Sequence, residues 1–334
     1  MDLTTFPRRR YTQGATPIEF LPRLSEALGG PDIYIKRDDM LGLAAGGNKT
    51  RKLEFLMADA IRQGVDTVLT CGAIQSNHCR LTLGAAVKEG LKCQLILEEC
   101  VPGTYDENAA GNNYLFKLLG AEKLHLRKAG IDANAELALL AAKLEEEGRH
   151  PYPIPVGGSN PIGALGYVAC MQEILQQSFE MGVHFDRIFC PIGSAGTYAG
   201  LLCGIVGTNA NIPLTAVSVS GMRAVQTRKT LALTDQLVPM LGMKTPVTEE
   251  DIDILDAYVG PGYSLPTKAM GEAVRLVART ESILLDPVYS GKTMSGLIDQ
   301  IRRGVYKKGE SVLFLHTGGS PALYVYMDAT LSED

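Results

Sequence analysis

The sequence predicts an α/β fold of two lobes, each built on an open, twisted parallel sheet with helices on both faces. Short, uniformly apolar runs alternate with longer stretches of helical periodicity, which is typical of parallel strands buried between layers of helices. The chain has 334 residues, which is more than a single hydrophobic core usually holds, and this length favours two lobes.

Strands are predicted where apolar runs are too uniform to leave one face in water. In chain order these runs are 68–71, 94–97, 187–191, 214–219 and 311–316. Helices are predicted between them, at 50–63, 78–90, 133–148, 162–178, 197–207, 267–279 and 291–303. A Pro- and Gly-rich segment at 148–158 is the candidate boundary between the lobes.

Composition excludes several classes of protein. Hydrophobic residues make up 46% of the chain, and the net charge of −5 is not concentrated in any run. We therefore expect no nucleic-acid partner, and the lack of an 18-residue apolar stretch predicts a cytoplasmic protein that does not enter the membrane. The seven cysteines form no CxxC pair. They predict buried, reduced thiols and no metal site.

A lysine follows two glycines at the start of the first predicted long helix, in the segment Gly46-Gly47-Asn48-Lys49. Unpaired N–H groups at a helix N-terminus favour anions and disfavour an additional proton on an amine. Lys49 is therefore a candidate nucleophile or phosphate ligand. The alternative is a solvated lysine in a flexible turn, since short Gly-rich motifs are common.

A second Gly-rich segment, 193–200, follows the predicted strand at 187–191 and opens a helix. Its glycines allow close backbone approach, and its Ser and Thr hydroxyls add donors, so it suits a small phosphate. It lacks the GK[ST] ending of a Walker loop and is not a convincing dinucleotide fingerprint. A tight strand-to-helix turn is the alternative.

Other polar residues follow predicted strands. Ser76, Asn77 and His78 come after the run at 68–71 and are costly to bury without partners, although Ser76 or Asn77 could simply cap a helix and His78 could be an interior histidine. Tyr289 follows the apolar segment 283–285, which reads as another strand end, and suits ring stacking, proton transfer or the core. Thr317 ends the last predicted strand.

Ligands of open α/β sheets bind at the carboxyl ends of the strands, where these loops are expected to meet. A reactive lysine, a phosphate cradle, a stacking aromatic ring and neutral hydroxyl donors together fit one cofactor, pyridoxal 5′-phosphate.

Six stretches, spread in order from about Phe6 to Tyr326, carry a family resemblance. They are GGNKTRKLEFL, AIQSNH, PVGGSNPIGALGYV, GSAGTYAGL, LLDPVYSGK and FLHTGGSPALY. Together they resemble the pyridoxal-phosphate enzymes of the 1-aminocyclopropane-1-carboxylate (ACC) deaminase and D-cysteine desulfhydrase family, of fold type II. The resemblance implies a homodimer, a large cofactor-binding domain of residues 1–50 and 159–334, and a small domain of residues 51–158.

The resemblance also implies residue roles. Lys49 looks like the lysine that binds the cofactor covalently, and Asn77 like the residue that meets the oxygen of the cofactor's ring. Tyr289 looks like the stacking tyrosine and Tyr263 like a second active-site tyrosine. Further cofactor contacts are implied for the cradle and for two hydroxyl residues, namely Gly193, Ser194, Ala195, Gly196, Thr197, Ser290 and Thr317. An amino-acid substrate would meet Ser76, Asn77 and His78, with Ser76 at its carboxylate; the catalytic set is Lys49, Ser76, Tyr263 and Tyr289.

The sequence departs from the deaminases at two positions. They carry a glutamate, which pairs with the pyridine nitrogen, where this chain has Ser290, and a glutamine where it has His78. A neutral hydroxyl weakens the electron sink, which favours simple β-elimination over opening of the cyclopropane ring. We therefore expect a lyase that uses Lys49 to remove the α-proton and releases pyruvate and ammonia.

The leaving group is predicted from the likeness of three sequence stretches to one subgroup of the family. The FPRRR start, the segment after Asn48 and the GGSNPIGALGYV stretch look closer to L-cysteate sulfo-lyases, which release sulfite, than to D-cysteine desulfhydrases, which release sulfide. L-cysteate is the expected substrate and D-cysteine the alternative. A sulfonate needs cations, for which Arg223, Arg228 and the run 8–10 are candidates, although surface arginines are the simpler interpretation. A nicotinamide-dependent dehydrogenase and a non-enzymatic binding protein are the competing classes.

Overall fold

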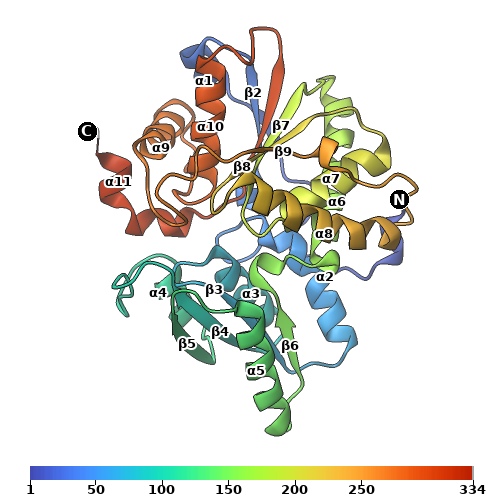
Figure 1. The fold of residues 1–334 in the computed structure, drawn as a ribbon, viewed down its shortest axis with the longest axis vertical. Coiled ribbons are helices and arrows are strands. Elements are labelled where there is room, and N and C mark those ends of the chain that lie inside the picture. Colours follow the sequence, from blue (N-terminus) through green and yellow to red (C-terminus); the bar gives the residue numbers. More distant parts are fainter. Residues whose placement is uncertain (333–334) are drawn as a thin grey trace.

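Two separate sheets organise the protein, and the computed structural model describes residues 1–332 of it. The six-stranded sheet has the order β1-β2-β10-β7-β8-β9 and the four-stranded sheet the order β5-β4-β3-β6. They lie one above the other in Figure 1. All paired strands are parallel except β1 and β2. The strands are β1 (Ile18–Phe20), β2 (Asp32–Lys36), β3 (Thr67–Ala73), β4 (Lys92–Glu99), β5 (Lys123–Lys128), β6 (Pro151–Ile154), β7 (Arg187–Ile192), β8 (Leu214–Ser218), β9 (Asp253–Leu255) and β10 (Ser311–Leu315).

The central strands of the large sheet are buried on both faces. In β7, Ile188 and Cys190 belong to one hydrophobic cluster and Phe189 to another, and Leu313 and Phe314 of β10 divide in the same way. Successive side chains of a strand point to opposite faces, so each face needs its own cover of helices. One cluster contains residues of α6 (Pro161–Met181), α7 (Gly196–Thr208) and α8 (Arg223–Met240). The other contains residues of α1 (Pro22–Leu28), α9 (Lys268–Glu281) and α10 (Ser290–Arg302).

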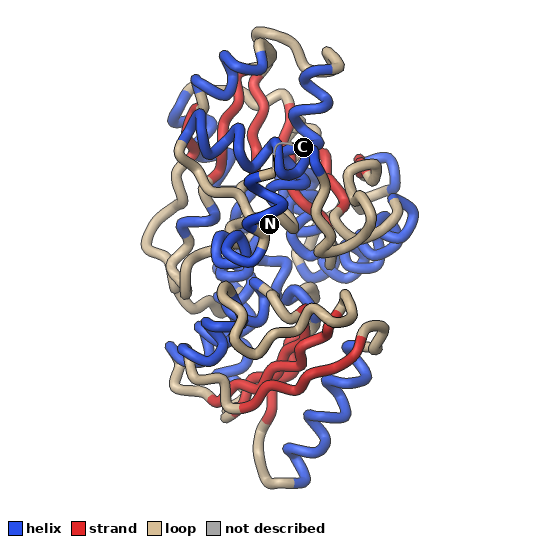
Figure 2. Tube along the Cα trace, turned by 90° about the vertical axis from the view of Figure 1, so that its left-hand side faces the viewer, coloured by secondary structure: helices blue, strands red, loops and turns tan. Residues whose placement is uncertain are grey.

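The small sheet is covered in the same manner. One face packs with α2 (Lys49–Arg62), α3 (Asn77–Lys88) and α4 (Asn112–Leu118), and the other with α5 (Ala133–Glu146). Helices flank the strands of both sheets in the view of Figure 2. This is the predicted α/β architecture. The five strands predicted from apolar runs and the predicted long helices are present, with ends within three residues of those expected. Division of the chain into domains at residues 50 and 158 stays a prediction.

Some elements differ from the sequence prediction. The segment 283–285 was expected to be a strand but forms none, and it connects α9 directly to α10. Within the predicted boundary 148–158, β6 pairs with β3 at the edge of the small sheet. An edge strand can contain Pro151 and Pro153 because one of its sides needs no N–H donors. The edge strand β5 was missed because its partly exposed, basic sequence lacks an apolar run.

Short elements complete the described chain: 3-10 turns at Leu3–Thr5, Asp38–Met40, Val156–Gly158, Glu249–Asp251 and Ser320–Val325, and α11 (Met327–Leu331). None of the helices described in residues 1–332 combines the length and apolar character needed to cross a membrane.

Candidate active site

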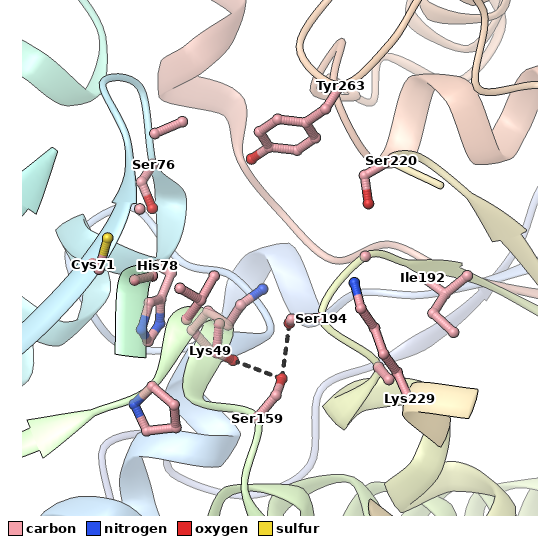
Figure 3. Close-up of a pocket in the computed structure, with 18 of the residues that line it drawn as sticks. Lys49, Cys71, Ser76, His78, Ser159, Ile192, Ser194, Ser220, Lys229 and Tyr263 are labelled. Carbon is pink, nitrogen blue, oxygen red and sulfur yellow. Dashed lines mark hydrogen bonds between the residues drawn. The ribbon is translucent and has the colours of Figure 1, made fainter. Parts of the chain in front are cut away.

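A cavity of about 720 Å³ is lined by residues from both sheets. Cys71 and Glu98 lie at the carboxyl ends of β3 and β4, Ile192 at the end of β7, and Ser220 just beyond β8. Most of the predicted site residues line it as well: Lys49, Ser76, His78, Gly193, Ser194, Ala195, Thr197, Tyr263 and Tyr289. Figure 3 shows Lys49, Ser76 and His78 on one side of this cavity and Ser220 and Lys229 on the other. Carboxyl-end loops therefore do converge, as expected for open α/β sheets.

Lys49 is the first residue of α2 and is almost completely buried. Its Nζ lies 3.0 Å from Asn48 Oδ1 and 5.6 Å from the centre of the Tyr289 ring. Burial lowers the pKa of Lys49 to about 8; the charge of Asp286 opposes this shift and that of Arg80 adds to it. A sizeable fraction of the amine is therefore neutral near neutral pH, which is the nucleophilic form.

The turn before Lys49 requires glycine. Gly46 has a φ of 70°, and a Cβ there would lie 1.7 Å from the carbonyl oxygen of Asp39. Only glycine fits this close approach and this backbone conformation. The Gly-Gly motif thus has a local cause, which is to start α2 at the cavity wall.

Residues 193–197 form a concave turn between β7 and α7. Ala195 adopts a left-handed conformation with a φ of 66°, and Gly196 is the first residue of α7. Ser194 Oγ lies 2.8 Å from Ser159 Oγ, and the N–H of Gly196 donates to the same Ser159 oxygen. Asn48 Nδ2 donates to Thr197 Oγ1, which connects this turn to the Lys49 loop. Hydroxyls and a helix N-terminus facing one space suit a phosphate.

Lys52 lies outside the cavity lining but contacts the residues that form the cradle, and the motif analysis missed it. Its side chain is buried, and Nζ donates to Gly157 O at 2.9 Å and to Ser159 Oγ at 3.2 Å. A Cβ on Gly196 would lie 2.8 Å from Nζ. Across residues 1–332 no carboxylate pairs with it, and burial followed by the charge of Lys49 holds its pKa well below the usual value. An anion in the cradle would supply the missing charge, so the residues present fit a phosphate group.

Tyr263 and Tyr289 form a hydrogen-bonded pair. Their hydroxyl oxygens lie 2.6 Å apart and their rings meet edge to face. Burial raises the pKa of both phenols above the usual value, and the contact with Tyr289 raises that of Tyr263 further. Both phenols are therefore neutral at physiological pH. They can donate hydrogen bonds but are not resting bases.

A buried lysine holds the loop of Tyr263. Lys292 Nζ donates to Val259 O at 2.7 Å and to Gly262 O at 2.8 Å, and burial lowers its pKa to about 8. The bond to Gly262 fixes the residue directly before Tyr263. Lys292 thus connects the first turn of α10 with the loop that forms one wall of the cavity.

Four predicted cofactor contacts lie outside the cavity lining: Asn77, Gly196, Ser290 and Thr317. Ser290 is buried, and its Oγ donates to Asp286 Oδ1 at 2.7 Å. A contact between Ser290 and the pyridine nitrogen of the cofactor stays a prediction. It would require the Ser290 hydroxyl to break its hydrogen bond to Asp286. Thr317 is buried, and its hydroxyl forms no hydrogen bond with another group of residues 1–332, so its donor is available.

The predicted substrate contacts are partly used within the protein. Ser76 Oγ accepts from the N–H of Cys79, which confirms Ser76 as the cap of α3. Ser76 also lines the cavity, and its contact with a substrate stays a prediction. His78 Nε2 lies 2.7 Å from Thr70 Oγ1. Burial, with the charges of Lys49 and Lys52, holds the pKa of His78 well below its usual value. His78 is therefore neutral and cannot pair with a substrate anion.

The arginines considered for a sulfonate lie elsewhere. Arg223 and Arg228 are exposed on α8, while Arg8 and Arg9 form ion pairs with Glu54 and Glu89. None of them lines the cavity, where Lys49 and Lys229 are the basic side chains.

Comparisons with known proteins agree with this geometry. A family model described as "Pyridoxal-phosphate dependent enzyme" matches residues 10–318. The D-cysteine desulfhydrases of Salmonella typhimurium and Salmonella typhi are each 46% identical to the chain over 326 residues, which covers 97% of either sequence. The crystal structure of an ACC deaminase homologue superposes with a TM-score of 0.88 at 40% identity, covering 98% of this chain and 97% of that one.

Proposed function

This chain belongs to the family of pyridoxal-phosphate-dependent enzymes, and on that premise we propose that it converts D-cysteine and water into sulfide, pyruvate and ammonia. It is a lyase of fold type II with pyridoxal 5′-phosphate as its cofactor. The main support for D-cysteine as the substrate is the 46% identity to D-cysteine desulfhydrases over nearly the whole chain. The lack of a lining arginine supports it, because a thiol substrate brings only one anionic group, its carboxylate.

When bound, the cofactor draws electrons from the α-carbon of an amino acid and so makes loss of the α-proton feasible. Lys52 and the turn at 193–197 would hold its phosphate, and the ring of Tyr289 would lie against its pyridine ring. Thr317 supplies a free hydroxyl next to the loop that leads to Lys49, because the backbone N–H of Asn48 donates to the carbonyl oxygen of Thr317. These contacts would fix the cofactor between the two sheets.

The chain's own groups would then move the protons. Lys49, with a pKa of about 8, can accept the α-proton as the neutral amine. Ser76 and the free N–H groups at the start of α3 would hold the carboxylate. In the Tyr263–Tyr289 pair one hydroxyl donates to the other, which leaves one phenolic proton to stabilise the departing sulfur. Elimination breaks the Cβ–S bond, and hydrolysis of the resulting enamine yields pyruvate and ammonia.

The depressed pKa of Lys49 predicts how apoprotein captures its cofactor. Only the neutral amine reacts with the aldehyde, so the capture rate should rise with pH and reach half its maximum near pH 8, the pKa of the buried amine. Stopped-flow absorbance after mixing apoprotein with pyridoxal phosphate measures this midpoint. A midpoint at the ordinary lysine value near 10.5 would mean that Lys49 is not desolvated as described.

L-cysteate remains a second candidate substrate because of one feature of the cavity. Lys229 lines it together with Ser220, and the two could bind a sulfonate through a charge and a hydroxyl. This would make L-cysteate a substrate that releases sulfite. Ser220 also lies beside Gly193 of the cradle. Lys229, which lines the same part of the cavity, could therefore neutralise the cofactor's phosphate instead of a sulfonate. ACC is less favoured, because Ser290 and His78 replace the glutamate and glutamine of the deaminases.

A homodimer is part of the proposal. Tyr324, Val325, Met327 and Leu331, near the end of the described chain, are large apolar residues exposed to solvent. Such a concentration is typical of a surface that another protein covers. Light scattering of the holoenzyme should give twice the 35.9 kDa mass of one chain; a mass of one chain at micromolar concentration would contradict this.

A further inference from the structure

Arg80 is a buried cation that the proposed mechanism does not use. Its side chain, on the first turn of α3, is completely buried. Nη1 donates to Asn77 Oδ1 at 2.9 Å and to Asn112 Oδ1 at 2.5 Å, and Nη2 donates to Gly46 O at 2.8 Å. All three acceptors are neutral, and Nε is buried without a partner in the described chain. The charge of the buried Asp286 favours the charged form of Arg80, but no ion pair joins the two in residues 1–332, and burial still lowers the pKa of Arg80 to about 10. A buried charge without a hydrogen-bonded counter-ion is costly, so a charge of this kind needs a compensating role.

The three acceptors belong to three different segments of the chain, and none of the three lines the cavity itself. Asn77 begins α3, Asn112 begins α4, and Gly46 lies in the turn that leads to Lys49. Arg80 therefore connects the loop of the reactive lysine with the start of the helix that carries Ser76 as its cap. Movement of one would require movement of the other.

The same contacts fix the orientation of the Asn77 amide. Its Oδ1 accepts from Arg80 Nη1 and from Asn112 Nδ2, the latter at 2.8 Å. A guanidinium has only donors, so the oxygen of Asn77 must face it and the amide cannot rotate. Asn77 Nδ2 is left pointing away from Arg80, and no protein acceptor within residues 1–332 takes its hydrogen bond. It lies near Gly319, where a Cβ would be 2.5 Å from Nδ2.

We propose that Arg80 is a positioning residue for the cofactor, which turns the NH2 of Asn77 toward the ring oxygen of pyridoxal phosphate and holds that oxygen in its anionic form. The anionic ring oxygen, contacted through Asn77, would provide the negative charge that none of the hydrogen-bond partners of Arg80 carries. The amide of Asn77 relays the effect, since an amide whose oxygen binds a cation is a better donor through its nitrogen. This inference rests on the cofactor and on the predicted role of Asn77, but not on the identity of the substrate.

Two variants separate charge from orientation. Arg80→Met introduces an unbranched, uncharged side chain, which removes the charge and all three hydrogen bonds while keeping a similar side-chain length. Arg80→Gln also removes the charge, but its side-chain amide keeps a donor for Asn77 Oδ1, and the bond from Asn112 to Asn77 is kept. Lys88→Met is the matched control, because Lys88 is an exposed cation on the same helix. Thermal melting of each holoenzyme checks that it is folded.

The measurement is the pH midpoint of the visible absorption of the bound cofactor, without substrate, together with the cofactor dissociation constant. Removing a nearby cation raises the proton affinity of the bound cofactor, so both Arg80→Met and Arg80→Gln should raise the midpoint by about one unit, a tenfold change. Arg80→Met should also weaken cofactor binding about tenfold or more, while Arg80→Gln, which keeps a donor for Asn77, should stay within about threefold of the wild type. Lys88→Met should change neither.

An unmoved midpoint in Arg80→Gln would overturn the proposal, even if Arg80→Met fails to fold. Weaker cofactor binding in Arg80→Met with an unmoved midpoint would also overturn it, because a purely structural bridge predicts that result. Since no substrate is present, failure of this inference is distinguishable from failure of the proposed lyase activity.

Discussion

Lys49→Ala should lose turnover by at least about three orders of magnitude and should lose the visible band of the lysine-bound cofactor. The variant removes both the covalent attachment and the amine that accepts the α-proton, and a general base alone contributes about 10² to 10⁴ in rate. Steady-state pyruvate formation and an absorption spectrum measure the two losses.

Lys49→Arg is the matched control for charge. It keeps a cation at the start of α2, but a guanidinium does not deprotonate at neutral pH and cannot form the bond. We expect no rescue by Lys49→Arg. If either variant kept substantial turnover and the visible band, another residue would be the attachment site, and a ligand-binding protein that needs no lysine would be the better interpretation.

Lys52→Met should weaken cofactor binding by about 30-fold or more. Loss of one partner of a buried, hydrogen-bonded charge pair costs about 2–5 kcal/mol, and each 1.4 kcal/mol is a factor of ten. Equilibrium dialysis of apoprotein with pyridoxal phosphate gives the dissociation constant. Pyridoxal without the phosphate should bind wild type and variant alike, which assigns the loss to the phosphate.

The stability of the apoprotein should change in the opposite direction. Without an anion, folding buries the Lys52 ammonium, whose pKa is depressed, so the unfolded chain binds the proton more tightly. Replacing it with an apolar side chain of similar length removes that cost, and the apoprotein should melt no lower than the wild type. Unchanged cofactor affinity together with a less stable apoprotein would show that Lys52 serves the fold and not the phosphate.

The fold was predictable from sequence where burial is uniform. Residues 188–191 and 312–315 are apolar throughout because both faces of β7 and β10 are covered, and such runs are easily recognised. The segment 283–285 has the same composition but forms no strand, since tertiary packing against α9 and α10 places it. Composition alone does not distinguish these cases.

The site was predictable in part. Loops after β3, β7 and β10 carry recognisable polar residues, and Lys49, Ser76 and the turn at 193–197 do line one cavity. Lys52 and Arg80 were missed because a lysine or arginine on a helix is usually a solvated charge. Only the structure shows that these two are buried and that neither forms an ion pair within residues 1–332. The three-residue spacing from Lys49 to Lys52 was the available signal, since it places both on one helix face.

The same reasoning explains the uncertainty over the leaving group. L-cysteate was predicted from likeness of sequence stretches, and arginines were only candidates to hold its sulfonate. Arg223 and Arg228 are exposed outside the cavity, and Arg8 is paired with Glu54. Charge counts along a sequence do not say which side of a helix meets the ligand. In the folded chain, Lys229 is the basic side chain that lines the cavity on the side opposite Lys49.

The most direct test of this account is a product assay on purified holoenzyme with D-cysteine, L-cysteine and L-cysteate, measuring sulfide, sulfite and pyruvate in each reaction. We predict stoichiometric sulfide and pyruvate from D-cysteine, with kcat/KM at least about tenfold above that for L-cysteate, a difference of about 1.4 kcal/mol in transition-state stabilisation. Sulfite and pyruvate from L-cysteate, with no sulfide from D-cysteine, would contradict it.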